Sequence, residues 1–189
     1  MKKILSVMRI TAPLVLLSGL VCLAWFPGRM TGGGSVFQSA SVDLAQFDSS
    51  GRVTHGFEIH CGSDANNSST KNNLEINWVD ASGNHHRFHL DDTLQSADCT
   101  WDPTVGSPNP PPANFNRFDG IGTGKFDGAA GAHIQFTLTD AGEPGTSDAA
   151  AYSISDASGT VVLQVPPCTT PDGYGRCFLN KGNQQAHDQ

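Results

Sequence analysis

After its first 26 residues, the chain consists of short runs in which hydrophobic and polar residues alternate, separated by Gly, Asn, Asp, Ser and Pro. Side chains alternate between the two faces of a β-strand, so a period of two predicts strands, and the separators predict turns. We therefore expect an all-β fold, an antiparallel β-sandwich or a flattened barrel of seven or more short strands. The clearest runs lie at 35–43, 54–61, 73–79, 86–90, 132–140, 150–156 and 160–165.

Two segments between these runs have an unusual composition. Residues 107–115, SPNPPPANF, contain four prolines, which remove backbone donors, so we expect an extended crossover connection there. Residues 120–128, GIGTGKFDG, begin with glycine at alternate positions, which predicts a strand or bend that another backbone or an aromatic ring approaches closely. Neither segment predicts a domain boundary, and we expect a single domain over residues 30–189.

The first 26 residues have the pattern of an export signal. Lys2, Lys3 and Arg9 precede an apolar run at 10–26, which is typical of a signal peptide; a retained membrane anchor is the alternative. Cleavage after Ala24 would leave 8 basic and 18 acidic residues, a net charge of −10. Such a surface repels phosphate backbones, so we expect no nucleic-acid partner, and no membrane contact after cleavage. The predicted location is secreted, periplasmic or on the cell surface.

Four cysteines follow the signal segment, and none forms a C-x-x-C pair. An even number of cysteines in an exported chain predicts disulfides rather than a zinc-ribbon or thioredoxin-type site. The segment PPCTTPDGYGRC is turn-rich and short enough to close on itself, so we expect Cys168 to pair with Cys177. Cys61 is then left to pair with Cys99. The shorter bridge would close an insert at about 166–178.

Strand parity predicts a polar face on three neighbouring strands. In HGFEIHC, NNLEINW and HHRFHL, apolar residues alternate with polar ones, and the connections between the runs are short. We expect the polar residues on one face to form a binding patch: Glu58, His60, Glu75, Asn77, Arg87 and His89. Its imidazoles and carboxylates would suit Zn²⁺, Cu²⁺ or an acid–base pair. The alternative is a structural network in which Arg87 pairs with Glu58 or Glu75.

A second acidic set lies in TDAGEPGTSD at 139–148, which contains Asp140, Glu143 and Asp148. Oxygen ligands on a loop suit Ca²⁺, although the spacing departs from that of an EF-hand. The alternative is that Asp140 and Asp148 cap a hairpin loop. The sequence contains no G-x-S-x-G, H-E-x-x-H, Walker or Rossmann motif, so we assign no catalytic residue and no cofactor beyond this option of Ca²⁺ or Zn²⁺.

Several stretches occur in a set order: MTGGGSVF, VTHGFEIHC, NNLEINW, RFHL, GIGTGKFDG, LTDAGEPGTSDAA and KGNQQAHD. Together they resemble the post-COAP domain, a module of exported and cell-surface bacterial proteins that begins with T-G-G-G and ends with G-N-x-Q-x-H. The resemblance covers residues 30–187, and the cysteine-containing insert departs from it. It implies a β-rich appendage without an established activity, so it assigns no catalytic residue.

These observations predict an exported, non-catalytic binding or structural module of the cell envelope or extracellular space. A surface protein or a glycan is the expected partner. Two alternatives are a small metal-dependent hydrolase or lyase that uses the His/Glu face, and a calcium-stabilised adhesive module. The segments TGGGSVF and GNQQAH are both expected at a sheet edge, close to each other.

Overall fold

The structure is a computed structural model that describes residues 28–37, 51–62, 65, 71–106, 109–166 and 168–188. The predicted signal segment and most of the first predicted strand, residues 38–43, lie outside the described residues. In the described part of the chain, no helix is long and apolar enough to cross a membrane.

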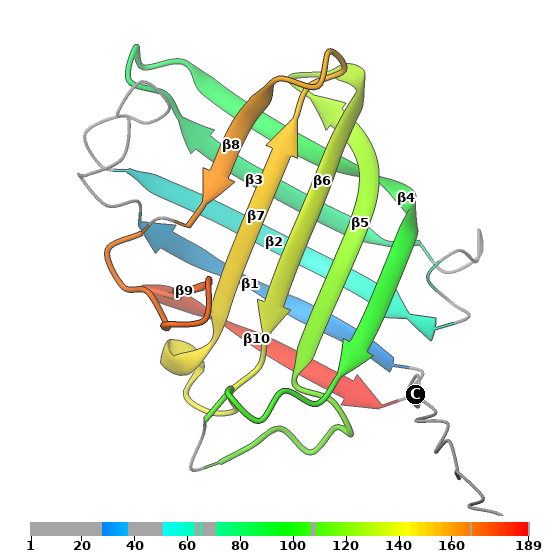
Figure 1. Ribbon diagram of the computed structural model, residues 1–189, viewed down its shortest axis with the longest axis vertical. Coiled ribbons are helices and arrows are strands. Elements are labelled where there is room, and N and C mark those ends of the chain that lie inside the picture. Colours follow the sequence, from blue (N-terminus) through cyan, green and yellow to red (C-terminus); the bar gives the residue numbers. More distant parts are fainter. Residues whose placement is uncertain are drawn as a thin grey trace, which may run out of the picture.

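In the residues that the structure describes, ten strands, all paired antiparallel, form one sheet that curls into a half-barrel (Figure 1). The sheet order is β10-β1-β2-β3-β4-β5-β6-β7-β8, and β9 pairs with β7. The expected all-β class is confirmed. The strands are β1 (Gly28–Phe37), β2 (Arg52–Cys61), β3 (Asn73–Val79), β4 (His85–Thr100), β5 (Arg117–Phe126), β6 (Ala129–Thr139), β7 (Ala149–Ser155), β8 (Val161–Val165), β9 (Cys177–Phe178) and β10 (Lys181–Asp188), with a 3-10 turn, η3 (Gly145–Ser147), before β7.

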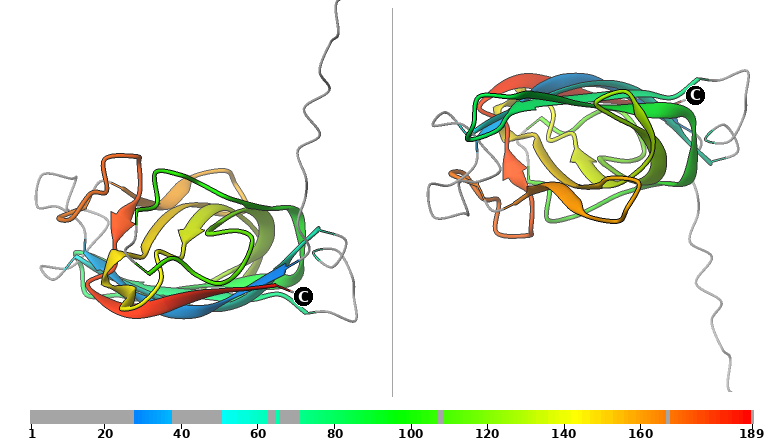
Figure 2. Two further views of the ribbon diagram at one scale, coloured as in Figure 1. Left: turned by 90° about the horizontal axis from the view of Figure 1, so that it is seen from below. Right: turned by 90° about the horizontal axis from the view of Figure 1, so that it is seen from above.

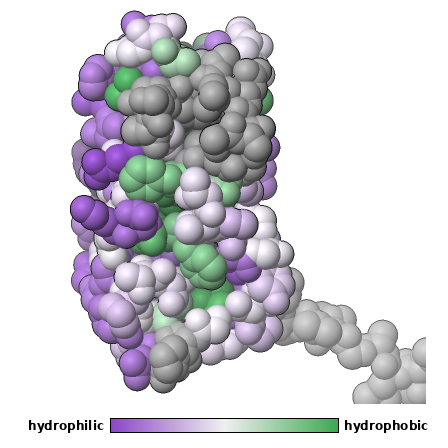
Figure 3. Space-filling model, turned by 90° about the vertical axis from the view of Figure 1, so that its left-hand side faces the viewer, coloured by the Kyte–Doolittle hydropathy of each residue, from purple (hydrophilic) through white to green (hydrophobic). Residues whose placement is uncertain are grey.

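The sheet curls through β4 and β5. The register between these strands shifts between Leu90 and Leu94 and again between Leu94 and Ser96, and such bulges bend a strand and increase its twist. The curl separates two layers, β10-β1-β2-β3 with the start of β4, and the end of β4 with β5 to β8 (Figure 2). Opposite the curl the sheet is open, and apolar residues lie along a strip between more polar surfaces (Figure 3).

The core lies between the two layers and consists of the inward-facing residues of both. Phe57, Ile59 and Cys61 are buried from β2, as strand parity predicts. In the second layer the rings of Phe118 and Phe136 stack with centroids 5.8 Å apart. The expected Cys61–Cys99 disulfide is present and joins β2 to the far end of β4 inside this core.

Glycines on the inner face of β5 make room for side chains of the neighbouring strands. A Cβ atom at Gly120 would overlap the ring of Phe136, and one at Gly124 would overlap the ring of Phe88. The alternating glycines in GIGTGKFDG therefore mark the close aromatic approach that the sequence predicts.

The two terminal strands of the described chain lie side by side, as expected, but only β10 is at the sheet edge, because β1 lies between β10 and β2. β1 and β10 are antiparallel, with Gly28 opposite Asp188 and Ser35 opposite Lys181. The predicted start of the first strand at residue 35 is wrong, because the strand already begins at Gly28 and runs through the three glycines of TGGG. A Cβ atom at Gly34 would lie 2.6 Å from the carbonyl oxygen of Lys181, so these glycines permit close packing against β10.

The proline-rich segment is not a crossover. β4 and β5, which it connects, are direct hydrogen-bonded neighbours in the sheet. The connection instead lies across one end of the half-barrel (Figures 1 and 2), where Ala113 and Phe115 enter the core. Prolines thus prevent strand formation here, as predicted, but the segment serves as an end cover held by buried side chains.

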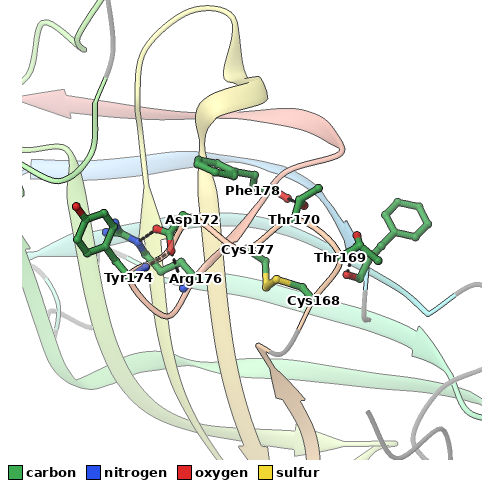
Figure 4. The surroundings of a disulfide bond; sticks show 9 residues. Cys168, Thr169, Thr170, Asp172, Tyr174, Arg176, Cys177 and Phe178 are labelled. Carbon is green, nitrogen blue, oxygen red and sulfur yellow. Dashed lines mark hydrogen bonds and ion pairs between the residues drawn. A yellow bond between two sulfur atoms is a disulfide. The ribbon is translucent and has the colours of Figure 1, made fainter. Parts of the chain in front are cut away.

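The expected Cys168–Cys177 disulfide is also present, and it closes the insert between β8 and β9 (Figure 4). Inside this loop, Oδ1 of Asp172 accepts hydrogen bonds from the backbone N–H of Tyr174, at 2.8 Å, and from that of Arg176, at 3.0 Å. Two disulfides in one small β-rich chain are typical of proteins that fold in oxidising, extracellular compartments.

Candidate functional site

The predicted polar residues lie on the outer face of the first layer. Strand register places Glu75 opposite His89 and Asn77 opposite Arg87, so β3 and β4 present two polar rows side by side. Glu58 lies on the same face of β2, opposite Asn73 of β3. We call the five solvent-accessible members of this set the outer patch: Glu58, Glu75, Asn77, Arg87 and His89.

The outer patch is held by pairing across neighbouring strands. Glu75 Oε2 lies 3.8 Å from Nη1 of Arg87 and 3.7 Å from Nδ1 of His89, and its Oε1 accepts a hydrogen bond from the amide of Asn77 at 3.1 Å. Arg87, His89 and Glu75 have side-chain exposures of 60%, 47% and 39%. Such exposed pairs contribute only about 0–1 kcal/mol each to folding stability, so their side chains remain available to a partner.

His60 does not belong to the accessible patch. Parity places it on the polar face, but it is only 7% exposed, so its predicted role as a surface residue is wrong. Its backbone N–H donates to Oδ1 of buried Asn72 at 2.7 Å, and its Nδ1 has no hydrogen-bond partner among the described residues. Glu58, for which the sequence predicted Arg87 as one possible partner, forms an ion pair with Arg29 of β1, at 3.3 Å.

A hollow of about 400 Å³ borders the outer patch at the β3–β4 hairpin, and Asn77 and Arg87 contribute to its wall. His86 lies beside it, with Nδ1 2.7 Å from Oδ2 of Asp127 and Nε2 3.3 Å from Oδ2 of Asp80. Burial alone would lower the pKa of His86, but these two carboxylates raise it above its ordinary value. The imidazole also packs against the rings of Trp78 and Phe126, so this histidine stabilises the hairpin rather than lying free in solvent.

The acidic loop is held to β10 by its own carboxylates. Asp140 accepts hydrogen bonds from the backbone N–H groups of Gly142 and Ala186, both at 2.7 Å. Asp148 accepts from those of Ala141 and Gln184, at 2.8 and 2.7 Å. Both side chains belong to buried residues, so they cap the loop, as the hairpin alternative predicts, and fasten it to the terminal strand.

The third acidic residue of the loop also contacts β10. Glu143 Oε1 accepts hydrogen bonds from the amides of Asn183, at 2.8 Å, and Gln185, at 3.1 Å. Burial raises the pKa of Asp148 to about 7; the negative charges of Asp140 and Glu143 act in the same direction and the two backbone donors oppose it. A calcium ion bound by Asp140, Glu143 and Asp148 together would have to replace the hydrogen bonds that these side chains accept.

A buried polar network joins the two layers and was not predicted. The imidazole of His55 in β2 lies between the hydroxyl of Tyr152 in β7, at 2.6 Å, and the amide nitrogen of Gln184 in β10, at 3.3 Å. All three residues are at most 6% exposed. Parity does place His55 on the inner face, but its partners are distant in the sequence and no local motif identifies them.

Across the described residues, no group of three or more His, Cys, Asp or Glu side chains is arranged to hold a metal ion. The outer patch offers one carboxylate beside one imidazole and one fixed cation, and Arg87 would repel a metal ion bound there. Comparison of the chain with protein-family models, with curated proteins and with solved structures gave no match.

Proposed function

We propose that the protein is an exported, non-catalytic binding module of the cell envelope or extracellular space, and that the outer patch contacts its partner. The observation that carries this proposal is the patch itself, in which acidic, amide, guanidinium and imidazole groups are held in register on adjacent strands and remain solvent-exposed. The predicted signal segment, the two disulfides and the resemblance to the post-COAP domain support an extracellular location.

Binding suits this geometry better than catalysis. Active sites exclude water to strengthen electrostatic interactions, whereas Glu75, Arg87 and His89 lie on an open strand surface. Side chains of both charge signs, spread over rigid strands, match a polar protein surface of complementary charge pattern. We therefore expect a surface protein as the partner of this face.

The test measures retention of the purified, labelled protein on intact cells of the organism that produces it. We expect the triple variant Glu75→Gln, Arg87→Gln and His89→Gln to lose at least tenfold in apparent affinity with an unchanged melting temperature. The matched control is His133→Gln with Gln135→Ala, two exposed positions on β6 in the other layer. Equal retention of both variants would show that the outer patch is not the recognition surface.

Export is tested separately, by sequencing the N-terminus of the protein recovered outside the cytoplasm. We expect the mature chain to begin near Trp25, since the small residue Ala24 ends the predicted signal. An intact Met1 in that fraction would favour the alternative of a retained anchor.

A further inference from the structure

Two exposed aromatic side chains flank a second hollow, which shares no residue with the outer patch. Trp101, directly after β4, is 49% exposed, and Tyr174, in the disulfide-closed insert, is 63% exposed. Both line a hollow of about 370 Å³ together with Asp102, Thr104 and Arg117. Its volume lies within the range of small-molecule sites, roughly 300–1,000 Å³.

The polar floor of this hollow is pre-organised. Asp102 Oδ2 accepts hydrogen bonds from Nη1 of Arg117 at 3.0 Å and from Nη1 of Arg176 at 2.9 Å. Its Oδ1 accepts from the backbone N–H of Thr104 at 2.8 Å and from the hydroxyl of Thr104 at 2.5 Å. Because these partners fix the floor before any ligand arrives, little conformational entropy would be lost on binding.

Different contacts position the two aromatic side chains, Trp101 and Tyr174. The residues on either side of Trp101 are tied to buried Asn116, whose backbone N–H donates to the carbonyl of Thr100 and whose side chain accepts from the N–H of Asp102. Tyr174 lies with its ring centroid 5.8 Å from the guanidinium carbon of Arg176 (Figure 4). Arg176 is only 3% exposed and reaches from the insert to Asp102, so it holds the insert, and with it Tyr174, against the body of the protein.

We propose that this hollow, the aromatic site formed by Trp101, Tyr174, Asp102, Thr104 and Arg117, binds a neutral carbohydrate. A sugar ring has an apolar C–H face that stacks on an aromatic ring and a rim of hydroxyl groups that both donate and accept hydrogen bonds. The site offers both features, two exposed rings and a floor with guanidinium donors and carboxylate acceptors.

The charge of the floor selects against acidic sugars. Arg117 donates from Nε and Nη2 to Asp119, at 2.6 and 2.9 Å, and Arg176 pairs with Asp172 as well as with Asp102. Three carboxylates therefore surround two guanidinium groups, and an added anion would meet an excess of negative charge. A proline-rich peptide would also stack on aromatic rings, but such grooves are apolar, whereas this floor is ionic.

The test is affinity electrophoresis of the full chain in gels that contain laminarin, xylan or galactomannan, with polygalacturonate as the charged polymer. We expect at least one neutral polymer to retard the wild-type protein, and Trp101→Ala and Tyr174→Ala each to reduce the retardation at least tenfold. Ile121→Ala and Val161→Ala are the matched controls, since these apolar residues are similarly exposed elsewhere, at 41% and 46%. Tyr174→Leu keeps an apolar side chain in the insert but removes the aromatic ring, so we expect it to reduce the retardation as much as Tyr174→Ala does.

The proposal would be overturned by no retardation of the wild-type protein by any neutral polymer, by equal retardation of the Trp101 variant and its controls, or by retardation by polygalacturonate alone. Binding of a decaproline peptide that depends on Trp101, without retardation by the sugars, would also overturn it and assign the hollow to a peptide. The aromatic site shares no residue with the outer patch, so the outcome is independent of the partner proposed for that face.

Discussion

The Nδ1 atom of His55 lies 2.6 Å from the hydroxyl oxygen of Tyr152, although the two residues are 97 positions apart. This hydrogen bond joins β2 of one layer to β7 of the other through the core. The imidazole of His55 thus has a polar partner at each ring nitrogen, Tyr152 at Nδ1 and Gln184 at Nε2. The network therefore holds the two layers together in a fixed relative position.

Replacing Tyr152 with Phe should destabilise the fold by about 1–3 kcal/mol, because the buried Nδ1 of His55 loses its hydrogen-bond partner. Denaturant unfolding measures the change in the free energy of unfolding. The control is Tyr174→Phe in the exposed insert, for which we expect a change within about 0.5 kcal/mol. Equal changes in the two variants would show that the hydrogen bond contributes nothing.

His55 should make the protein less stable in acid. Burial lowers its pKa from 6.5 to about 3, so between these values the unfolded chain binds a proton that the folded chain does not. The free energy of unfolding then falls as the pH drops below 6.5, by at most about 1.4 kcal/mol per pH unit. We expect the stability gap between the wild type and His55→Gln, measured by urea unfolding at each pH, to shrink between pH 7 and pH 4. A gap that stays constant would contradict the burial of a neutral imidazole at this position.

Asp148 should make the protein more stable as the pH falls, in contrast to His55. Burial raises its pKa from 3.8 to about 7, so the folded chain holds a proton that the unfolded chain releases between these values. The contribution of Asp148 to stability therefore increases as the pH falls from 7 toward 4. We expect the wild type to gain stability relative to Asp148→Asn over this range, in urea titrations at each pH. A gap that stays constant across this pH range would contradict this assignment.

Arg176→Met should destabilise the protein by about 3 kcal/mol, because it leaves Asp172 without its buried cation and removes one of the two guanidinium partners of Asp102. The matched control is Arg87→Met, whose exposed ion pair with Glu75 should contribute at most about 1 kcal/mol. Chemical denaturation compares the two. A loss below that of the control would show that the ion pairs of Arg176 do not hold the insert.

Calcium should leave the thermal stability unchanged. The carboxylate oxygens of Asp140 and Asp148 already accept backbone hydrogen bonds, so binding a cation would exchange one set of partners for another. We expect the melting temperature with millimolar CaCl₂ and with EDTA to agree within about 1 °C. A ligand that binds only the folded chain raises this temperature, so an increase of several degrees would restore the calcium alternative.

Local patterns were sufficient for the class of fold and for much of its chemistry. Alternation located β2, β3, β6, β7, β8 and the first part of β4, although β4 continues to Thr100, well beyond the predicted run. It placed Phe57 and Ile59 inside and Glu75 and Arg87 outside, because side-chain direction in a strand depends only on parity. The short, turn-rich segment between Cys168 and Cys177 predicted one disulfide and, by elimination, the other. These inferences need only neighbouring residues and the chemistry of turns.

The tertiary structure alone decided which distant groups meet. It pairs β4 directly with β5 across the proline-rich segment, buries His60 on a face where parity predicts exposure, and brings Arg176 to Asp102 across 74 positions. The curvature that produces these contacts comes from the bulges of β4 and from packing summed over the whole sheet. A period of two cannot encode that curvature, so the sequence determined which face of a strand is apolar, and only the packing of the two layers determined what covers each face.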